Sequence, residues 1–167
     1  MSAGGAPVWA GGPIVRLAGP GDESALRTLA PSGQAETDAP PLATPPLLPP
    51  LPPLPSNLAE YLTDGCSFIA HTPTATIGYL LAQPLAYDGA TPLTLWIAAV
   101  VVHPAWRRRG VGTALCRALG DWAREAGVAG ALAAMPAQDV GTLAFWRRVG
   151  FSTHREELGL WRFDDAE

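Results

Sequence analysis

The sequence predicts a single domain of the α/β (α+β) class, and three observations support this. Segments rich in β-branched and other apolar residues alternate with segments of helical periodicity along most of the chain. A buried strand, a glycine-containing loop and a helix follow one another directly over residues 100–115. The length of 167 residues and the hydrophobic fraction of 48% fit one domain with its own core. We expect this domain over residues 14–167, after a flexible tail of residues 1–13.

The N-terminal part predicts one strand, one helix and an irregular insert. Residues 14–17 alternate apolar and polar as a strand does, and Asp22 is placed to cap a helix over residues 23–30. Prolines then dominate residues 31–56, which excludes a helix interior and a central strand there. Polyproline II or disorder is expected for this insert. It is either a spacer or a docking ligand for an aromatic groove, and its leucines could also pack back on the domain.

The middle of the chain predicts a short helix and three strands. Asn57 and Glu60 form a capping box for the helix, and residues 64–65 close it. The three strands are joined by turns through residues 72–74 and around residues 88–89. They are expected over residues 66–71, 76–85 and 93–103.

The C-terminal part alternates between helices and strands. The first helix carries a stripe of core residues and ends at Gly127, and the final strand carries its charges in the middle. The expected elements are a helix over residues 110–126, a strand over 130–135, a helix over 139–149 and a strand over 151–163. The expected core stripe consists of Val111, Leu115, Ala118 and Trp122.

Three arginines and two glycines lie between the strand that ends near residue 103 and the helix after it. They bring side-chain cations, bare backbone amides and the positive end of a helix dipole to one place, so we predict an anion site that suits a phosphate. A solvated charge run is the alternative, and the two glycines argue against it. A P-loop is excluded because the chain contains no lysine, and the three-glycine dinucleotide fingerprint is incomplete.

A second motif follows in the helix that ends at Gly150, where Phe145 and Trp146 precede Gly150-Phe151. With Arg107-x-x-Gly110-x-Gly112, it resembles the GNAT superfamily of acetyl-CoA-dependent N-acetyltransferases. In that family an R/Q-x-x-G-x-G/A loop cradles the coenzyme A pyrophosphate, and a later helix ends in an aromatic pair, three variable residues and Gly-Phe. The order of elements is similar to the family over almost the whole chain, apart from the proline-rich insert.

The resemblance implies a fold and a cosubstrate. The fold is a mixed, mostly antiparallel sheet of six to seven strands flanked by about four helices, splayed between the fourth and fifth strands. Acetyl-CoA would bind there, with pantetheine added along the fourth strand, and a backbone amide near Val102 would polarise the thioester carbonyl. The residues expected to bind the coenzyme are Val100, Val101, Val102, Arg107, Arg108, Arg109, Gly110, Val111, Gly112, Thr113, Asp139 and Trp146.

Catalytic side chains are harder to assign. In relatives that acetylate protein N-termini, a glutamate serves as base and a tyrosine as acid, and these positions fall on Ala134 and Trp146 here. Neither residue can transfer a proton near neutral pH. We therefore expect direct attack of the amine with water as the proton relay, and Tyr79 is the first candidate for a replacement acid. The three histidines, His71, His103 and His154, are expected to be packed or solvated.

The expected function is transfer of an acetyl group from acetyl-CoA to a primary amine of a small molecule or a peptide. One alternative is an acyl-CoA-binding sensor or regulator that has lost catalysis, and another is a nucleotide-binding module of unrelated fold. A net charge of −4 argues against nucleic acid as a partner. The N-terminus lacks the pattern of a secretory signal, and the longest apolar run, residues 95–102, is too short to span a bilayer.

We therefore expect a cytoplasmic protein with no membrane partner, as a monomer or homodimer. Cys66 and Cys116 lack metal-ligand spacing, so we expect two reduced, buried thiols and no metal. A catalytic cysteine is the alternative, but the sequence places no base near either residue.

Overall fold

The computed structural model of the chain describes residues 12–34, 55–63, 65–85, 94–134, 140–155 and 158–163. These residues form one seven-stranded sheet in the order β1-β2-β3-β4-β5-β7-β6. The strands are β1 (Ile14–Leu17), β2 (Phe68–His71), β3 (Thr76–Leu85), β4 (Thr94–Val102), β5 (Gly130–Ala134), β6 (Ser152–Arg155) and β7 (Leu158–Arg162). The helices are α1 (Glu23–Gln34), α2 (Leu58–Thr63), α3 (Val111–Glu125) and α4 (Val140–Val149), with 3-10 turns η1 (Pro20–Asp22) and η2 (Pro104–Trp106).

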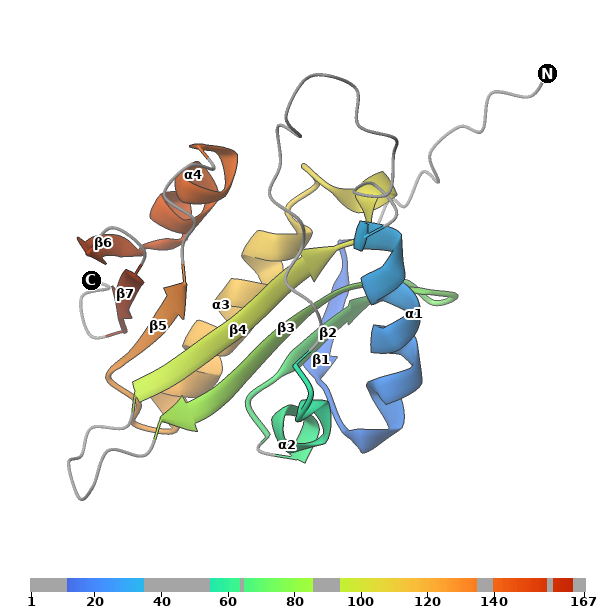
Figure 1. The fold of residues 1–167 in the computed structure, drawn as a ribbon, viewed down its shortest axis with the longest axis horizontal. Helices are drawn as coiled ribbons and strands as arrows, with labels where there is room; N and C mark the ends of the chain where they lie inside the picture. The colour runs from blue at the N-terminus through green and yellow to red at the C-terminus, as the bar shows by residue number, and fades with distance from the viewer. Residues whose placement is uncertain are drawn as a thin grey trace.

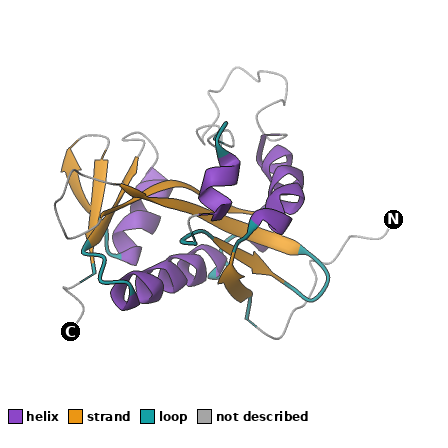
Figure 2. Ribbon diagram, turned by 90° about the horizontal axis from the view of Figure 1, so that it is seen from below, coloured by secondary structure: helices purple, strands orange, loops and turns teal. Residues whose placement is uncertain are grey.

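Helices cover both faces of the sheet (Figures 1 and 2). The long helix α3 lies on one face, and α1 and α2 lie on the other. The core under α3 contains Leu115 and Leu119, and the core under α1 and α2 contains Leu26 and Leu58. The strand pairs are antiparallel except β4 with β5, which are parallel. The predicted mixed, mostly antiparallel sheet with four flanking α-helices is confirmed.

A β-bulge divides β4 into two halves. Leu81 of β3 lies opposite Ala99 while Ala82 lies opposite Ile97, so Ala98 is the extra residue on β4. Before the bulge Leu95 and Ile97 face the α3 core, whereas after it Ala99 faces the α1 and α2 core. A bulge bends its strand and increases the local twist. The pairing of β4 with β5 ends at the same point, with Ile97 opposite Ala133.

Beyond Ile97, β4 and β5 diverge (Figure 1). This is the predicted splay between the fourth and fifth strands, and it is confirmed. The second half of β4, residues 99–102, keeps its pairing with β3 on one edge. Within the described residues, the register gives this half no strand partner on its other edge.

Helix α1 corrects the expected start of the proline-rich insert. It extends to Gln34, through Pro31, instead of ending at Ala30. A proline lacks the N–H that would bond four residues back, but the rest of the turn can continue if that one bond is given up. The first four residues of the expected insert, 31–34, are therefore helical. Residues 35–54 of the insert lie outside the described residues, as do residues 1–11 of the expected tail.

The expected final strand over residues 151–163 is two strands. β6 and β7 pair antiparallel, with Ser152 opposite Leu160, and the chain reverses between Arg155 and Leu158. Residues 156–157, which carry two of the charges in the middle of this segment, lie outside the described residues. β7 then pairs with β5 and lies between β5 and β6.

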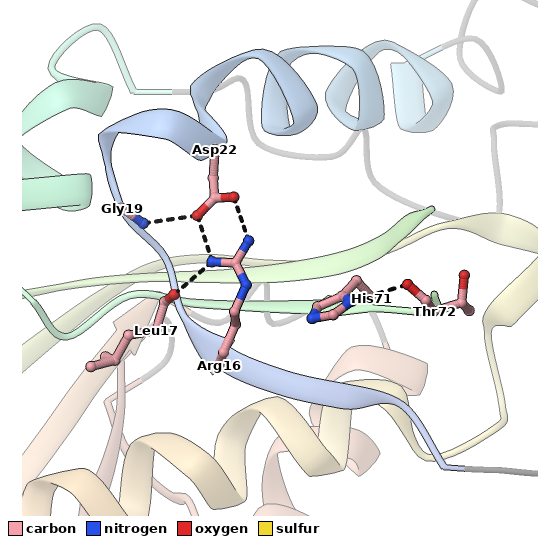
Figure 3. Close-up of polar contacts among 6 residues, drawn as sticks. All are labelled: Arg16, Leu17, Gly19, Asp22, His71 and Thr72. Atoms are coloured by element: carbon pink, nitrogen blue, oxygen red, sulfur yellow. Dashed lines mark hydrogen bonds and ion pairs between the residues drawn. The ribbon is translucent and has the colours of Figure 1, made fainter. Parts of the chain in front are cut away.

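Asp22 also differs from its expected role as the cap of α1. Its carboxylate accepts the Gly19 N–H at 2.9 Å and pairs with both guanidinium nitrogens of Arg16 at 2.8 and 2.7 Å (Figure 3). The hydrogen bond from Arg16 lowers the pKa of Asp22. The reason is that Asp22 belongs to the 3-10 turn η1, which brings its side chain close to Gly19 and β1 before α1 begins.

Two smaller expectations are also resolved. Asn57 and Glu60 do meet at the start of α2, but through a 2.7 Å bond from the Asn57 amide to the Glu60 carboxylate. In α3, Val111 and Leu115 are buried as expected, while Ala118 and Trp122 are half-buried. The other buried residues of α3 are Cys116, Leu119, Gly120 and Ala123. Among the described residues, no helix is long and apolar enough to cross a membrane.

Candidate functional site

The start of α3 is a helix N-terminus that carries no side-chain cap. Gly110 holds the N-cap position with φ at 80°, where a side chain would be strained. The first helical bond runs from the Ala114 N–H to the Gly110 carbonyl at 2.9 Å. The amides of Val111, Gly112 and Thr113 therefore have no acceptor within the helix. Free amides and the positive end of the helix dipole favour an anion at this end of α3.

The three arginines before α3 take three different positions. Arg107 is half-buried and donates its Nε–H to the Val102 carbonyl at 3.1 Å. Arg108 is exposed and has a φ of 62°, the only positive φ of a non-glycine residue among those described. The guanidinium carbon of Arg109 lies over the ring of Trp106, 5.4 Å from the ring centroid. The three residues directly precede the uncapped start of α3 in the chain, and their role in binding an anion there stays a prediction.

The end of β4 presents backbone groups on the edge that faces away from β3. The His103 N–H donates to the Ile77 carbonyl of β3 at 2.8 Å. Because strand residues alternate in direction, the N–H and C=O groups of Val100 and Val102 face away from β3. We call these groups the open edge of β4, since the pairing with β5 has ended before them. An extended ligand can bond there as an added strand does.

Two glycines allow close packing around this edge. A Cβ on Gly112 would lie 3.1 Å from the Phe145 ring of α4 and 3.8 Å from the Val102 side chain. A Cβ on Gly78 of β3 would lie 2.9 Å from the Val101 carbonyl. The end of β4 therefore meets β3, the start of α3 and α4 at contacts that a larger residue could make only if its neighbours shifted. Sequence analysis did not predict these contacts, although a glycine inside an apolar strand is a signal for close approach.

Trp146, expected to contact the coenzyme, lies in the core under α3. Its side chain is 6% exposed, and its ring packs against Phe145 and Phe151 with centroid distances of 5.2 and 4.8 Å. Asp139, the other expected residue of this region, lies outside the described residues. The start of α3, the end of β4 and Phe145 thus lie together, and Trp146 packs against Phe145 within the core under α3.

Tyr79, the candidate acid, is buried on the other face of the sheet. It is 1% exposed and lies opposite Val101 of β4. Burial raises the pKa of Tyr79 to about 12. A thiol has a pKa of about 8.5, so this hydroxyl is the weaker acid and proton transfer from it to a leaving thiolate is unfavourable. The catalytic role of Tyr79 stays a prediction that its surroundings disfavour.

The other titratable candidates have local partners. His71 Nδ1 donates to the Thr72 carbonyl at 3.0 Å (Figure 3), and His103 Nδ1 accepts the Ala105 N–H at 3.2 Å. Cys66 and Cys116 are buried and form no disulfide, as expected, and the Cys66 thiol donates to the Ala82 carbonyl at 3.0 Å. Burial raises the pKa of the Cys116 thiol to about 12, which disfavours a nucleophilic thiolate. The part of the chain that the structure describes holds no group of three or more potential metal-ligating side chains.

Comparison with known proteins gives one family and many similar folds. The model of the acetyltransferase (GNAT) family matches residues 38–151. A search of curated proteins found no match. Among solved structures, a GNAT family acetyltransferase from Brucella melitensis in complex with acetyl-CoA is 20% identical, with a TM-score of 0.61 over 91% of this chain and 88% of that chain.

Two further structures are similar in fold. A chain of the NatC complex bound to Gag peptide and CoA has a TM-score of 0.65 at 13% identity, over 89% of this chain and 94% of that one. An aminoglycoside acetyltransferase from an uncultured soil metagenomic sample, in complex with trehalose, has a TM-score of 0.62 at 18% identity, over 82% and 86%. At these identities the similarity concerns the fold.

Proposed function

Since the chain belongs to the GNAT family of acetyltransferases, we propose that it transfers an acetyl group from acetyl-CoA to a primary amine. One observation carries this proposal: the uncapped start of α3 and the open edge of β4 are joined by the short loop of residues 103–110. A phosphate-binding end and a strand-like edge in direct succession suit a ligand with a pyrophosphate and an extended amide-containing arm. Coenzyme A is such a ligand.

The coenzyme would be held mainly by backbone groups. Amides of residues 108–113 would bind the pyrophosphate, with the charges of Arg108 and Arg109 beside them. Pantetheine would lie along the open edge, bonding Val100 and Val102 as an added strand. The acetyl-CoA and CoA complexes among the structures of similar fold support this arrangement. The residues involved form part of one domain, which we propose extends over residues 14–167.

The reaction would proceed by direct attack. The amine nitrogen attacks the thioester carbonyl, and an amide of the open edge stabilises the negative charge that develops on the carbonyl oxygen. The C–S bond then breaks, the thiolate leaves, and water takes the proton from the amine nitrogen. Ala134 has no titratable group and Trp146 lies in the core, so no side chain at these positions supplies an acid or a base. Positioning of the amine against the thioester and polarisation of the thioester carbonyl would account for the rate acceleration.

For the acceptor we propose a chemical class and no single compound. The similar structures include a complex with a peptide and an aminoglycoside acetyltransferase, which both concern amine-bearing molecules. We therefore propose a primary amine of a small molecule or a peptide. It would approach the thioester from the face of the sheet that carries α1 and α2, since α3 covers the other face (Figure 2).

A second candidate function is a coenzyme sensor without turnover. The absence of an acid or base at Ala134 and Trp146 favours it. An acceptor screen of amines and peptides, monitored by release of free CoA thiol, separates the two. The enzyme proposal predicts acceptor-dependent thiol release, whereas acetyl-CoA binding without release for any acceptor supports the sensor. No acetyl-CoA binding at all, measured by calorimetry, would overturn both.

A further inference from the structure

Arg107 differs from its two neighbours in what its side chain contacts. Its Nε–H donates to the carbonyl of Val102 at 3.1 Å, and its backbone is extended, with φ at −63° and ψ at 155°, directly after η2. The Val102 carbonyl belongs to the open edge, because the adjacent His103 N–H is bonded to β3. Arg107 thus contacts the backbone along which pantetheine would lie, from the side that faces β5.

The geometry points to Arg107 as a positioning residue that fixes the end of the open edge through its Nε–H, rather than as a phosphate ligand that acts through its charge. This inference rests on the proposed function. The bond joins the loop before α3 to the last residue of β4, so it sets the distance between the uncapped amides and the open edge. That distance is what a single ligand bound to both parts must match.

The chemistry of the side chain makes the inference specific. The Nε of arginine is attached to Cδ, and the amide nitrogen of glutamine is also attached to Cδ. Glutamine can therefore place an N–H donor at the same distance from the backbone without a charge. Lysine keeps the charge but carries its nitrogen one atom further out.

Arg108 offers a matched control. It is exposed and adjacent in sequence, and it lies outside the bond to Val102. Its removal takes away the same unit of charge near the same amides. A phosphate-directed charge should also show itself in the dependence of affinity on salt, because exposed charges are screened. Salt dependence therefore distinguishes the role of a charge from the role of a positioned donor.

The test compares Arg107→Met, Arg107→Gln, Arg107→Lys and Arg108→Gln by titration calorimetry with acetyl-CoA at low and high salt. We expect Met and Lys at position 107 to weaken affinity about tenfold, as loss of one charge-assisted hydrogen bond does. Arg107→Gln should keep the acetyl-CoA affinity within about threefold of the wild-type value, with an unchanged salt dependence. Arg108→Gln should reduce the salt dependence. Thermal unfolding of each variant establishes that it is folded.

Opposite rankings would overturn the inference. If Lys preserved affinity and Gln lost it together with part of the salt dependence, Arg107 would act through its charge. Full affinity of Arg107→Met would also exclude a positioning role. The Arg107 Nε–H resonance of the free protein gives a readout that needs no coenzyme. Slow exchange of this proton supports the bond to Val102, and fast exchange contradicts it, whether or not the wild type binds acetyl-CoA.

Discussion

The two halves of β4 are both largely apolar but have different surroundings. Residues 94–97 pair with β3 on one edge and with β5 on the other, and Leu95 and Ile97 lie in the α3 core. Residues 99–102 pair with β3 alone. Ala98, the bulged residue, separates the halves. The same apolar strand thus supplies the centre of the sheet in one half and, among the described residues, an edge without a strand partner in the other.

This difference shows how a binding edge can be built inside a stable sheet. An exposed strand edge at the border of a sheet invites pairing with other chains. Here the open edge lies in the interior of the strand order, with β5, β7 and β6 beyond it. The residue at the bulge moves β4 away from β5 while β3 continues to hold it. The backbone groups that could bind a ligand are therefore fixed by the sheet before the ligand arrives.

The largest effect should come from proline substitutions at two adjacent residues of the second half. Val101 bonds toward β3, so Val101→Pro removes a bond inside the sheet and should destabilise the protein by about 3 kcal/mol or more. Val100 faces the open edge, so Val100→Pro should remain folded but lose acetyl-CoA affinity by about thirtyfold or more. Thermal unfolding and calorimetry measure the two quantities. Equal destabilisation by both prolines would show that the edge at Val100 is not open.

A smaller effect is expected at the junction of β4 with α3 and α4. Gly112→Ala places a Cβ at 3.1 Å from the Phe145 ring, so the ring or α4 must shift. We expect a loss of about 1 kcal/mol in unfolding free energy. A smaller partner should relieve the contact, so Phe145→Leu and Gly112→Ala together should cost less than the sum of the single changes. Strict additivity in this double-mutant cycle would contradict the packing described.

The smallest effect on activity is expected for Tyr79, which lies beside the second half of β4. Tyr79→Phe should leave the rate within about threefold, because a hydroxyl with a pKa of about 12 does not protonate a thiolate efficiently. A hundredfold loss of kcat at unchanged stability would instead restore Tyr79 as the acid. This measurement decides whether the second half of β4 acts through its backbone alone or together with Tyr79 as a neighbouring acid.

Alkaline unfolding gives the same residue a second test. The folded pKa of Tyr79 is raised above the ordinary value of about 10, so its contribution to stability is complete below pH 10 and is lost as pH rises toward 12. Cys116 acts in the same direction and is present in both proteins. The unfolding free energy of Tyr79→Phe should therefore fall less steeply with pH above 10 than that of the wild type. Identical slopes would contradict the burial of the hydroxyl.

The sequence predicted the order of elements well because periodicity and glycine positions are local signals. The strand of residues 76–85 and the helix after Gly110 agree with the structure within a residue. Pairing is not local, so the division of residues 151–163 into two strands was missed. The extension of α1 through Pro31 was missed because proline disfavours a helix interior without forbidding it.

For the candidate site, too, local features could be predicted from the sequence, whereas features that depend on packing could not. The uncapped start of α3 follows from two glycines and is visible in the sequence. The expected role of Trp146 came from alignment of a motif, and its burial depends on packing with Phe151 that only the fold reveals. The bulge at Ala98 leaves no local signal, since alanine suits a bulge no better than its neighbours. The bond from Arg107 to Val102 likewise depends on the turn between them.

Hydrogen exchange of the β4 amides tests the central claim most directly. In the free protein, the Val101 amide should exchange slowly because it bonds to β3, while the amides of Val100 and Val102 should exchange faster. Saturating acetyl-CoA should slow exchange at Val100 and Val102 and in the first turn of α3, and leave Val101 nearly unchanged. Binding of acetyl-CoA without added protection at Val100 and Val102 would contradict the assignment of the open edge as the pantetheine site.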